Sequence, residues 1–145
     1  MTQLYSMPGH LFRRAQQIST SIFANECDRF NLTSVQFAAL FTIRAHPGLD
    51  ATRLSSLIAF DRSTIGDVLE RLEAKKWIRR GSSSDDKRVK LIYLAPEGEK
   101  LLQEVEPAVR RVQERLLAPL PPESRETMML LLTQLVSLHN EIASS

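Results

Sequence analysis

The sequence predicts a mainly α-helical protein with one small β-hairpin, in the order α-α-α-α-β-β-α-α. The first observation is a helical spacing of apolar residues before residue 76, as in the series that begins with Leu11 and Ala15, and again after residue 95. The second is a change of spacing between these parts, where two short runs that begin at Trp77 and Val89 flank the polar segment 81–87. Two short, closely spaced helices followed by a hairpin outline a winged helix-turn-helix.

The four N-terminal helices are each marked by residues that begin or end a helix. The first is expected over residues 8–30, because the proline at its start has no N–H and suits a first helical turn. Thr33 can cap the second helix, and the His-Pro-Gly segment 46–48 ends it. Asp50 can cap the third helix and Asp61 the fourth.

The second half of the chain combines the hairpin with two longer helices. The strands are expected over residues 77–80 and 89–94. Pro96 then begins a long helix whose apolar residues alternate in steps of three and four, and Pro107 inside it predicts a kink or a break. A last helix starts near Glu123, after a group of prolines.

The terminal helices are too apolar to remain in water without a partner. Met128 and Leu132, for example, share one apolar face of the last helix. The most economical partner is the same helices of a second copy of the chain. We therefore assign residues 1–32 and 96–145 to a helical dimerisation region of a homodimer, and residues 33–95 to a winged helix-turn-helix region, within one intertwined domain.

The net charge of +2 over 145 residues conceals an uneven distribution. Residues 51–90 carry 10 Lys/Arg against 6 Asp/Glu, whereas the rest of the chain carries 9 against 11. A basic middle between slightly acidic flanks favours a polyanionic partner for the central segment. In a winged helix-turn-helix protein the expected polyanion is double-stranded DNA.

Other classes of protein lack support in the sequence. No apolar run approaches the ~20 residues of a membrane helix, and residues 1–8 do not have the pattern of a secretory signal, so we expect a cytoplasmic protein. An enzyme is not expected, because no Gly-rich phosphate loop and no nucleophile–base set is present. The three histidines and Cys27 do not have the spacing of a metal site, so neither a metal nor a cofactor is expected.

The fourth helix and the hairpin carry the side chains that we expect at DNA. A helix that enters the major groove keeps one face apolar and presents short polar or basic side chains from its first turns. On the fourth helix these candidates are Arg62, Ser63, Thr64, Asp67 and Arg71, and on the hairpin they are Lys87, Arg88 and Lys90. A thin basic hairpin is suited to reach a minor groove or its flanking phosphates, although charged side chains on a helix face or a hairpin tip can also be merely solvated.

A resemblance to the MarR family of bacterial transcription regulators is carried by three segments. They are residues 61–80 (DRSTIGDVLERLEAKKWIRR), the wing motif 86–88 (Asp-Lys-Arg) and residues 91–98 (LIYLAPEG). The resemblance implies a homodimer with interlocking terminal helices, whose two recognition helices enter major grooves of a pseudo-palindromic operator. It also implies that Arg88 enters the adjacent minor groove and that Asp86 is the carboxylate that holds Arg88 in position.

The chain departs from the family pattern at two places. Many members have glycine at the position of Lys76, so this lysine either adopts a left-handed backbone or the helix ends differently. Many members also have a Ser/Thr-Arg pair where this chain has Gly66 and Asp67. Asp67 can then either accept a hydrogen bond from a cytosine amino group or pair with Arg71.

The resemblance further implies a repressor that is released by a small aromatic acid bound between the dimerisation helices and the winged region. Residues 7–18 (MPGHLFRRAQQI) resemble the branch of the family that controls nicotinate or hydroxyaromatic acid catabolism. A cavity for such an acid combines apolar walls with one or two cationic groups. The candidates for this cavity are Tyr5, His10, Arg14, Phe37 and Phe41.

Two alternatives to this function remain at the level of sequence. One is a winged module that binds another protein instead of DNA. The other is a regulator that senses an oxidant through Cys27. The carboxylates of Glu26 and Asp28 on either side of this cysteine disfavour its thiolate and hence its reactivity.

Overall fold

The structure, a computed structural model, describes residues 3–58 and 62–144, with only the backbone described for Arg62 and Ser144. Its elements follow the predicted order. They are η1 (Gln3–Ser6), α1 (Pro8–Cys27), η2 (Asp28–Phe30), α2 (Ser34–Ala45), α3 (Ala51–Ile58), α4 (Arg62–Ala74), β1 (Ile78–Ser82), β2 (Lys90–Leu94), α5 (Pro96–Leu117) and α6 (Pro122–Ser144).

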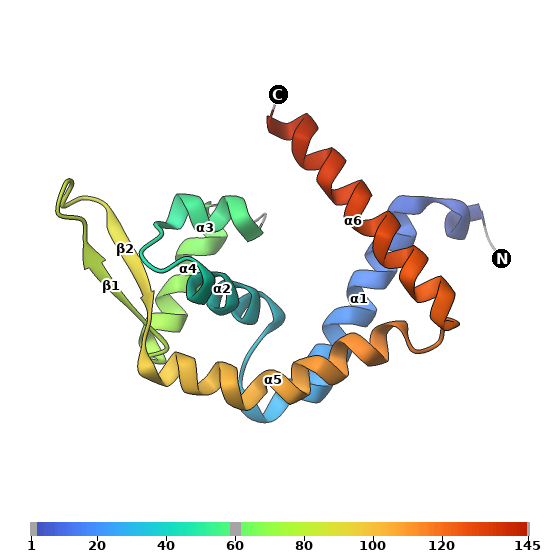
Figure 1. Ribbon diagram of the computed structural model, residues 1–145, viewed down its shortest axis with the longest axis horizontal. Helices are drawn as coiled ribbons and strands as arrows, with labels where there is room; N and C mark the ends of the chain where they lie inside the picture. Colours follow the sequence, from blue (N-terminus) through green and yellow to red (C-terminus); the bar gives the residue numbers. More distant parts are fainter. Residues whose placement is uncertain (1–2, 59–61, 145) are drawn as a thin grey trace.

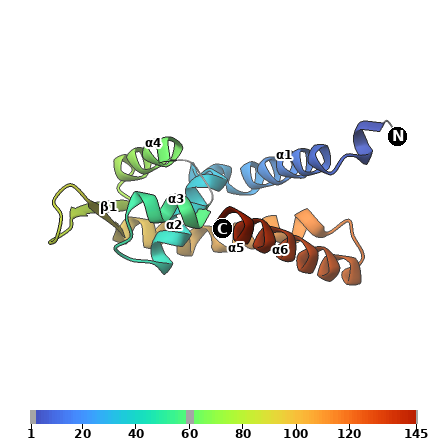
Figure 2. The ribbon, with the colours of Figure 1, turned by 90° about the horizontal axis from the view of Figure 1, so that it is seen from above.

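The molecule has two parts that α5 connects (Figure 1). The helices α2, α3 and α4 and the hairpin β1–β2 form one unit, which we call the winged head. The helices α1 and α6 and the C-terminal half of α5 form an extended helical arm. Figure 2 shows the hairpin and the N-terminus at opposite ends of the molecule.

The local signals at the helix ends of the winged head are those that the sequence predicts. The Thr33 hydroxyl accepts a hydrogen bond from the Gln36 backbone N–H, and the Gln36 side chain accepts one from the Thr33 N–H, which forms a capping box. Asp50 caps α3 by accepting from the Arg53 N–H at 2.8 Å, whereas the expected cap at Asp61 lies outside the described residues. The helices enclose one core whose fully buried side chains include Leu40, Ile43, Leu54, Ile65, Leu69, Leu72 and Ile92.

Lys76 ends α4 in the left-handed conformation, with φ of +64°. The Lys76 N–H donates to the Glu73 carbonyl at 2.9 Å, and the Trp77 N–H donates to the Leu72 carbonyl at 3.1 Å. These two bonds form a Schellman motif, which satisfies carbonyls at the helix end. Of the two possibilities that the sequence left open, the lysine therefore adopts the backbone that glycine has in many family members.

The hairpin pairs antiparallel, from Ile78 with Leu94 to Ser82 with Lys90. Both strands differ slightly from the predicted ranges: β1 runs further, to Ser82, and β2 begins one residue later. The Ile92 N–H donates to the Leu49 carbonyl at 2.9 Å, so the turn before α3 is tied to the edge of β2 that does not pair with β1. This bridge attaches the root of the hairpin to the helices of the head.

The first helix is shorter than the predicted range 8–30. The α-helix ends at Cys27, and a 3-10 turn follows over Asp28–Phe30. Asn31 then has φ of +52°, a left-handed conformation in which an α-helix cannot continue. The apolar spacing of the sequence did not reveal this tighter last turn.

The long helix α5 continues through Pro107 without a break, and Figure 1 shows that it bends near its middle. Proline has no N–H, so the carbonyl four residues earlier, that of Gln103, loses its helical partner. Of the kink and the break that Pro107 predicts as alternatives, the structure therefore has the kink. Beyond the proline, Glu26 of α1 accepts hydrogen bonds from Arg111 at 2.9 Å and Arg115 at 3.0 Å, which fastens α5 to α1.

The arm exposes a large apolar surface in the single chain. Leu130 and Ile142 of α6 are 69% and 68% exposed, and much of the apolar face of α6 is uncovered. Leu11, Phe12 and Ile18 of α1 are also exposed. Such a surface requires a partner in water.

The first turn of α5 generates a stability prediction. A Cβ atom at Gly98 would lie 2.2 Å from the Trp77 carbonyl oxygen, which accepts a hydrogen bond from the Ala95 N–H. We expect Gly98→Ala to lower the free energy of unfolding by about 1–3 kcal/mol, because backbone has to move. Urea denaturation of both proteins measures this difference.

Gly66→Ala is the matched control, because Gly66 is also helical and a Cβ atom there meets nothing within 4 Å. It should leave stability unchanged or raise it by roughly 0.5–1 kcal/mol. Equal effects of the two substitutions would contradict the steric argument.

Candidate nucleic-acid interface

The helix α4 presents a polar face to solvent and an apolar face to the core. Ile65, Leu69 and Leu72 are almost completely buried. Ser63, Asp67 and Arg71 are exposed and Thr64 is half-buried, while the side chain of Arg62 lies outside the described residues. Four of the five predicted residues of this helix therefore lie where a partner can reach at least part of the side chain.

A shallow hollow of about 190 Å³ lies between α4 and the start of α2. It is lined by Thr64, Asp67 and Arg71 from α4 and by Thr33 and Gln36 from the capping box. Among the described residues no ion pair joins Asp67 to Arg71. Of the two possibilities for Asp67, the pairing with Arg71 is not formed, and the carboxylate is available as an acceptor.

The wing arginine is held by the carboxylate that the sequence predicts. Asp86 Oδ1 accepts from the Arg88 backbone N–H at 2.9 Å and from Arg88 Nε at 3.2 Å, and Asp86 Oδ2 accepts from a terminal guanidinium nitrogen at 3.3 Å. These hydrogen bonds from Arg88 lower the pKa of Asp86 below its usual value. The carboxylate is therefore ionised at neutral pH, while the Arg88 side chain remains 91% exposed.

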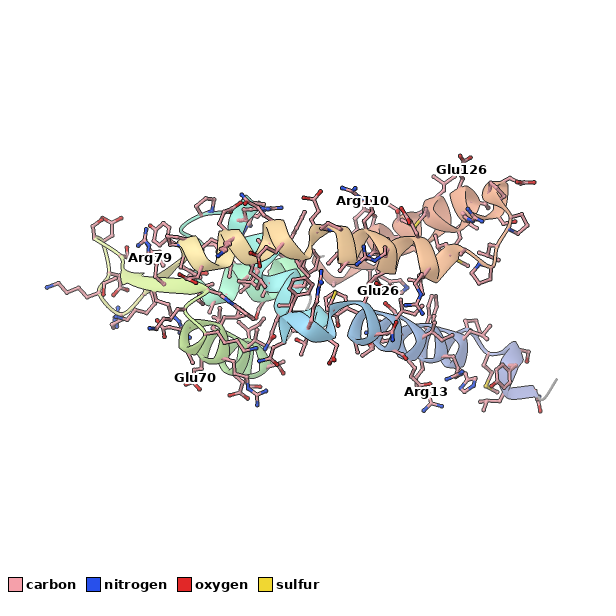
Figure 3. All side chains as sticks on the ribbon, turned by 90° about the horizontal axis from the view of Figure 1, so that it is seen from below. Arg13, Glu26, Glu70, Arg79, Arg110 and Glu126 are labelled. Carbon is pink, nitrogen blue, oxygen red and sulfur yellow. The ribbon has the colours of Figure 1, made fainter. Side chains whose placement is uncertain are left out.

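The two strands of the hairpin carry a second basic group. Lys90 Nζ donates to Ser82 Oγ at 3.1 Å, and the Arg79 guanidinium lies 4.4 Å from the centre of the Tyr93 ring. Figure 3 shows Arg79 at this end of the molecule. Arg80, Arg88 and Lys90 line a hollow of about 270 Å³ beside the first residues of α3.

Arg79 and Arg80 are the members of this group that were not among the predicted residues. The strand pairing puts Arg80 opposite Ile92, on the face of the hairpin that is turned toward the head. The alternation of side chains along a strand is the signal that could have identified this orientation. Lys87, in contrast, is exposed on the loop, as expected.

The predicted ligand residues are divided between two places in the chain. Phe37 and Phe41 of α2 line a cavity of about 350 Å³ against α5. Tyr5 and His10 pack edge to face at 4.9 Å near the N-terminus, and Arg14 donates to Gln17 at 2.6 Å on α1. Within one chain these three do not reach the cavity, because the first turns of α1 extend away from the head (Figure 1).

The charged side chains at this cavity are instead Arg44 of α2 and Glu106 and Arg110 of α5. Figure 3 shows Arg110 on the side of α5 away from α1, whereas Glu26 lies between the two helices. The sequence contained a weak signal for Arg44, which follows Phe41 by three residues and therefore shares its helix face. No comparable signal linked α2 to α5.

Cys27 is completely buried at the end of α1. Burial raises the pKa of its thiol, and the charge of Glu26 raises it further. The thiolate, which is the reactive form, is therefore disfavoured. This environment argues against the alternative in which Cys27 senses an oxidant.

Two general properties concern the described residues only. None of the helices in this part of the chain combines the length and apolar character needed to cross a membrane. Within residues 3–58 and 62–144, no group of three or more His, Cys, Asp or Glu side chains is arranged to hold a metal ion.

Comparisons with known proteins agree with this geometry. The MarR family model matches residues 32–90. The HTH-type transcriptional repressor NicR of Pseudomonas putida is 30% identical over 128 residues, which cover 88% of this chain and 81% of NicR. These residues extend well beyond the part that the family model matches.

Solved structures have the same fold. One of them is Bordetella bronchiseptica BpsR, whose structure addresses the regulation of its DNA binding by 6-hydroxynicotinic acid. BpsR is 30% identical to this chain, with a TM-score of 0.83 over 88% of this chain and 97% of the BpsR chain. The transcriptional repressor CouR bound to a 23-mer DNA duplex is 25% identical, with a TM-score of 0.87 over 94% of this chain and 96% of CouR. With its helix-turn-helix, its Asp86–Arg88 wing and its exposed apolar arm, this chain belongs to the MarR family of winged helix-turn-helix transcription regulators, DNA-binding proteins that act as dimers.

Proposed function

We propose that this MarR-family regulator is a repressor that binds a pseudo-palindromic operator through α4 and the wing and is released by a small aromatic acid. The observation that carries the proposal is the pair of hydrogen bonds from the Arg88 guanidinium to the Asp86 carboxylate. These bonds hold an almost fully exposed arginine on the hairpin loop. A preordered arginine of this kind loses little side-chain freedom when it binds.

The helix α4 is the element that enters the major groove in this proposal. Its exposed side chains include Ser63, Asp67 and Arg71, and its other face is anchored in the core. Residues of this length and polarity can reach base edges or phosphates. Asp67 accepts from a cytosine amino group, since it has no pairing with Arg71.

The wing extends the contact into the neighbouring minor groove. A narrow, A·T-rich minor groove has a strongly negative potential, which attracts an inserted arginine. Arg88 is the inserted side chain, and Asp86 fixes its direction from the opposite side of the guanidinium. Lys87 and Lys90 contact phosphates on either side.

The apolar arm supports the dimer on which an operator with two half-sites depends. The exposed apolar side chains of α1 and α6 lie on the part of the chain that is remote from the wing (Figure 2). Packing of two arms positions two heads at a fixed separation, about one turn of DNA or ~34 Å for such dimers.

The cavity between α2 and α5 supports the choice of effector. It has apolar walls from Phe37, Phe41, Leu102 and Val109 and carries arginines, which suits a small aromatic carboxylate. The similarity to BpsR, whose DNA binding is regulated by 6-hydroxynicotinic acid, supports the same chemical class. The cavity lies at the junction of the head and the arm, so its occupant can influence the spacing of the heads.

The wing generates the first prediction on DNA binding. Arg88→Ala should weaken operator binding by about 1–3 kcal/mol, the scale of one good groove contact. Asp86→Asn should weaken it less, because the charge of Arg88 remains and only its fixed orientation is lost. Fluorescence anisotropy with the DNA upstream of the protein's own gene measures both.

Lys100→Ala is the matched control, because it also removes one exposed positive charge from the head. Lys100 is on α5, and Figures 2 and 3 place α4 and α5 on opposite sides of the head. If Lys100→Ala weakens binding as much as Arg88→Ala does, the wing has no specific role.

A salt and effector titration tests the function as a whole. Binding to DNA through several phosphates should weaken steeply with salt, with a slope of about −0.9 per phosphate contacted. Addition of 6-hydroxynicotinic acid, or another acid of a small aromatic panel, should release the DNA in a gel-shift assay. A flat salt dependence without retardation of this DNA would favour the alternative of a protein-binding module.

A further inference from the structure

The cavity between α2 and α5 contains two arginines with different surroundings. Arg44 extends from the last turn of α2, and Arg110 from the α5 turn that follows Pro107. Between them the walls are apolar, with Phe37 and Phe41 on one side and Leu102 on the other. An aromatic carboxylate in this cavity could bind to the guanidinium of Arg44 or to that of Arg110.

Arg110 is already engaged by a carboxylate of its own helix. Its guanidinium donates to Glu106 Oε1 at 2.8 Å, a charged hydrogen bond between residues four apart on α5. A ligand would have to compete with a neighbour that is covalently held within reach. Water also screens this pair, whose side chains are about 65% exposed, but its 2.8 Å hydrogen bond occupies part of the Arg110 guanidinium, and among the described residues no such bond is present at Arg44.

Arg44 is held much more loosely. The nearest carboxylate is that of Glu99, at 3.8 Å, which is too long for a hydrogen bond. Both side chains of this ion pair are about 40% exposed, so water screens their attraction. Within the described part of the chain Arg44 donates no hydrogen bond that would fix its guanidinium elsewhere.

The Phe41 ring positions the Arg44 guanidinium at the cavity. The guanidinium carbon lies 5.1 Å from the ring centre, a distance typical of a cation–π contact. This contact is with a ring and not with an acceptor oxygen, so it does not replace a hydrogen bond to a carboxylate. A planar guanidinium can bind a carboxylate through two parallel hydrogen bonds. The Arg44–Glu99 ion pair, at 3.8 Å, does not form them.

We propose that the carboxylate of the effector replaces Glu99 as the partner of Arg44, and that Arg44 rather than Arg110 or Arg14 recognises the acid. This inference rests on the proposed function, because it names the side chain that binds the carboxylate of the effector in the same cavity. The ligand class is an aromatic monocarboxylate, whose ring packs beside Phe41 while its carboxylate binds Arg44.

The exchange has a consequence for the winged head. The Arg44–Glu99 pair joins the end of α2 to the first turn of α5, next to Gly98 and its close contact with the Trp77 carbonyl. An effector whose carboxylate binds Arg44 breaks this link between α2 and α5. It therefore binds better to the arrangement in which the two helix ends have separated, and it shifts the population toward that arrangement.

The experiment compares three full-length variants by isothermal titration calorimetry with 6-hydroxynicotinate and with benzoate. Arg44→Gln should weaken binding of the acid by roughly 10–100-fold, the effect of losing a charged hydrogen-bond pair. Glu99→Gln should strengthen it by up to about fivefold, because the competing carboxylate is gone. Arg110→Gln is the matched arginine control and should change the affinity by less than about threefold, in keeping with an exposed pair.

The opposite signs of the first two effects make the test specific. A variant that is merely misfolded cannot bind the acid more tightly, and the circular dichroism spectrum of each variant without the acid checks its fold. The neutral amides of both acids should bind weakly to all four proteins. In gel shifts, the acid concentration needed to release DNA should follow the same order.

Failure of this inference differs from failure of the proposed function. If the wild type releases DNA with the acids and Arg44→Gln responds equally, the assignment of Arg44 is wrong. Weaker binding by Glu99→Gln, or a loss of response in Arg110→Gln with Arg44→Gln unaffected, would also overturn it. If no acid binds to the wild type, the proposed effector function fails, and this inference fails with it.

Discussion

The close packing of Gly98 against the Trp77 carbonyl joins α5 to the hairpin, and the geometry of the molecule depends on this contact. Since no Cβ fits there, the start of α5 lies directly on the turn that follows α4. The other half of the same helix is fastened to α1 by the hydrogen bonds from Arg111 and Arg115 to Glu26. One helix therefore connects the turn before β1 to the helical arm.

The charged side chains of this framework have distinct physical roles. Glu26 joins two helices, and the hydrogen bonds from its two arginines lower its pKa, so it remains ionised at neutral pH. Asp86 acts within a single loop, where it orients Arg88 without burying it. The Arg44–Glu99 pair is the loosest of the three arrangements, at 3.8 Å and without a hydrogen bond. The loosest pair lies beside the cavity, where an exchange of partners costs little.

Local rules were sufficient to predict most of the fold from the sequence. The caps at Thr33 and Asp50 and the hairpin all depend on residues within a few positions of each other. The contact between Asp86 and Arg88, in contrast, was implied by the resemblance to the MarR family. The α1 terminus was placed too late, because the apolar spacing continues into the 3-10 turn before Asn31. The predicted cavity was assembled only in part, because its walls come from helices far apart in the sequence. Phe37 and Phe41 do line a cavity, but its charged side chains Arg44 and Arg110 depend on the packing of α5 along α2, which the sequence does not reveal.

The modest basic charge of the winged head is consistent with control by a small ligand. Each phosphate contact adds affinity that an effector must overcome in order to release the protein. Allosteric coupling between two sites in a protein typically amounts to about 1–3 kcal/mol. Residues 51–90 carry only four more basic than acidic side chains, since 10 Lys/Arg face 6 Asp/Glu. A strongly basic head would raise the affinity that such a coupling has to offset, so the modest charge balance of this head favours release by the exchange of partners that we propose for Arg44.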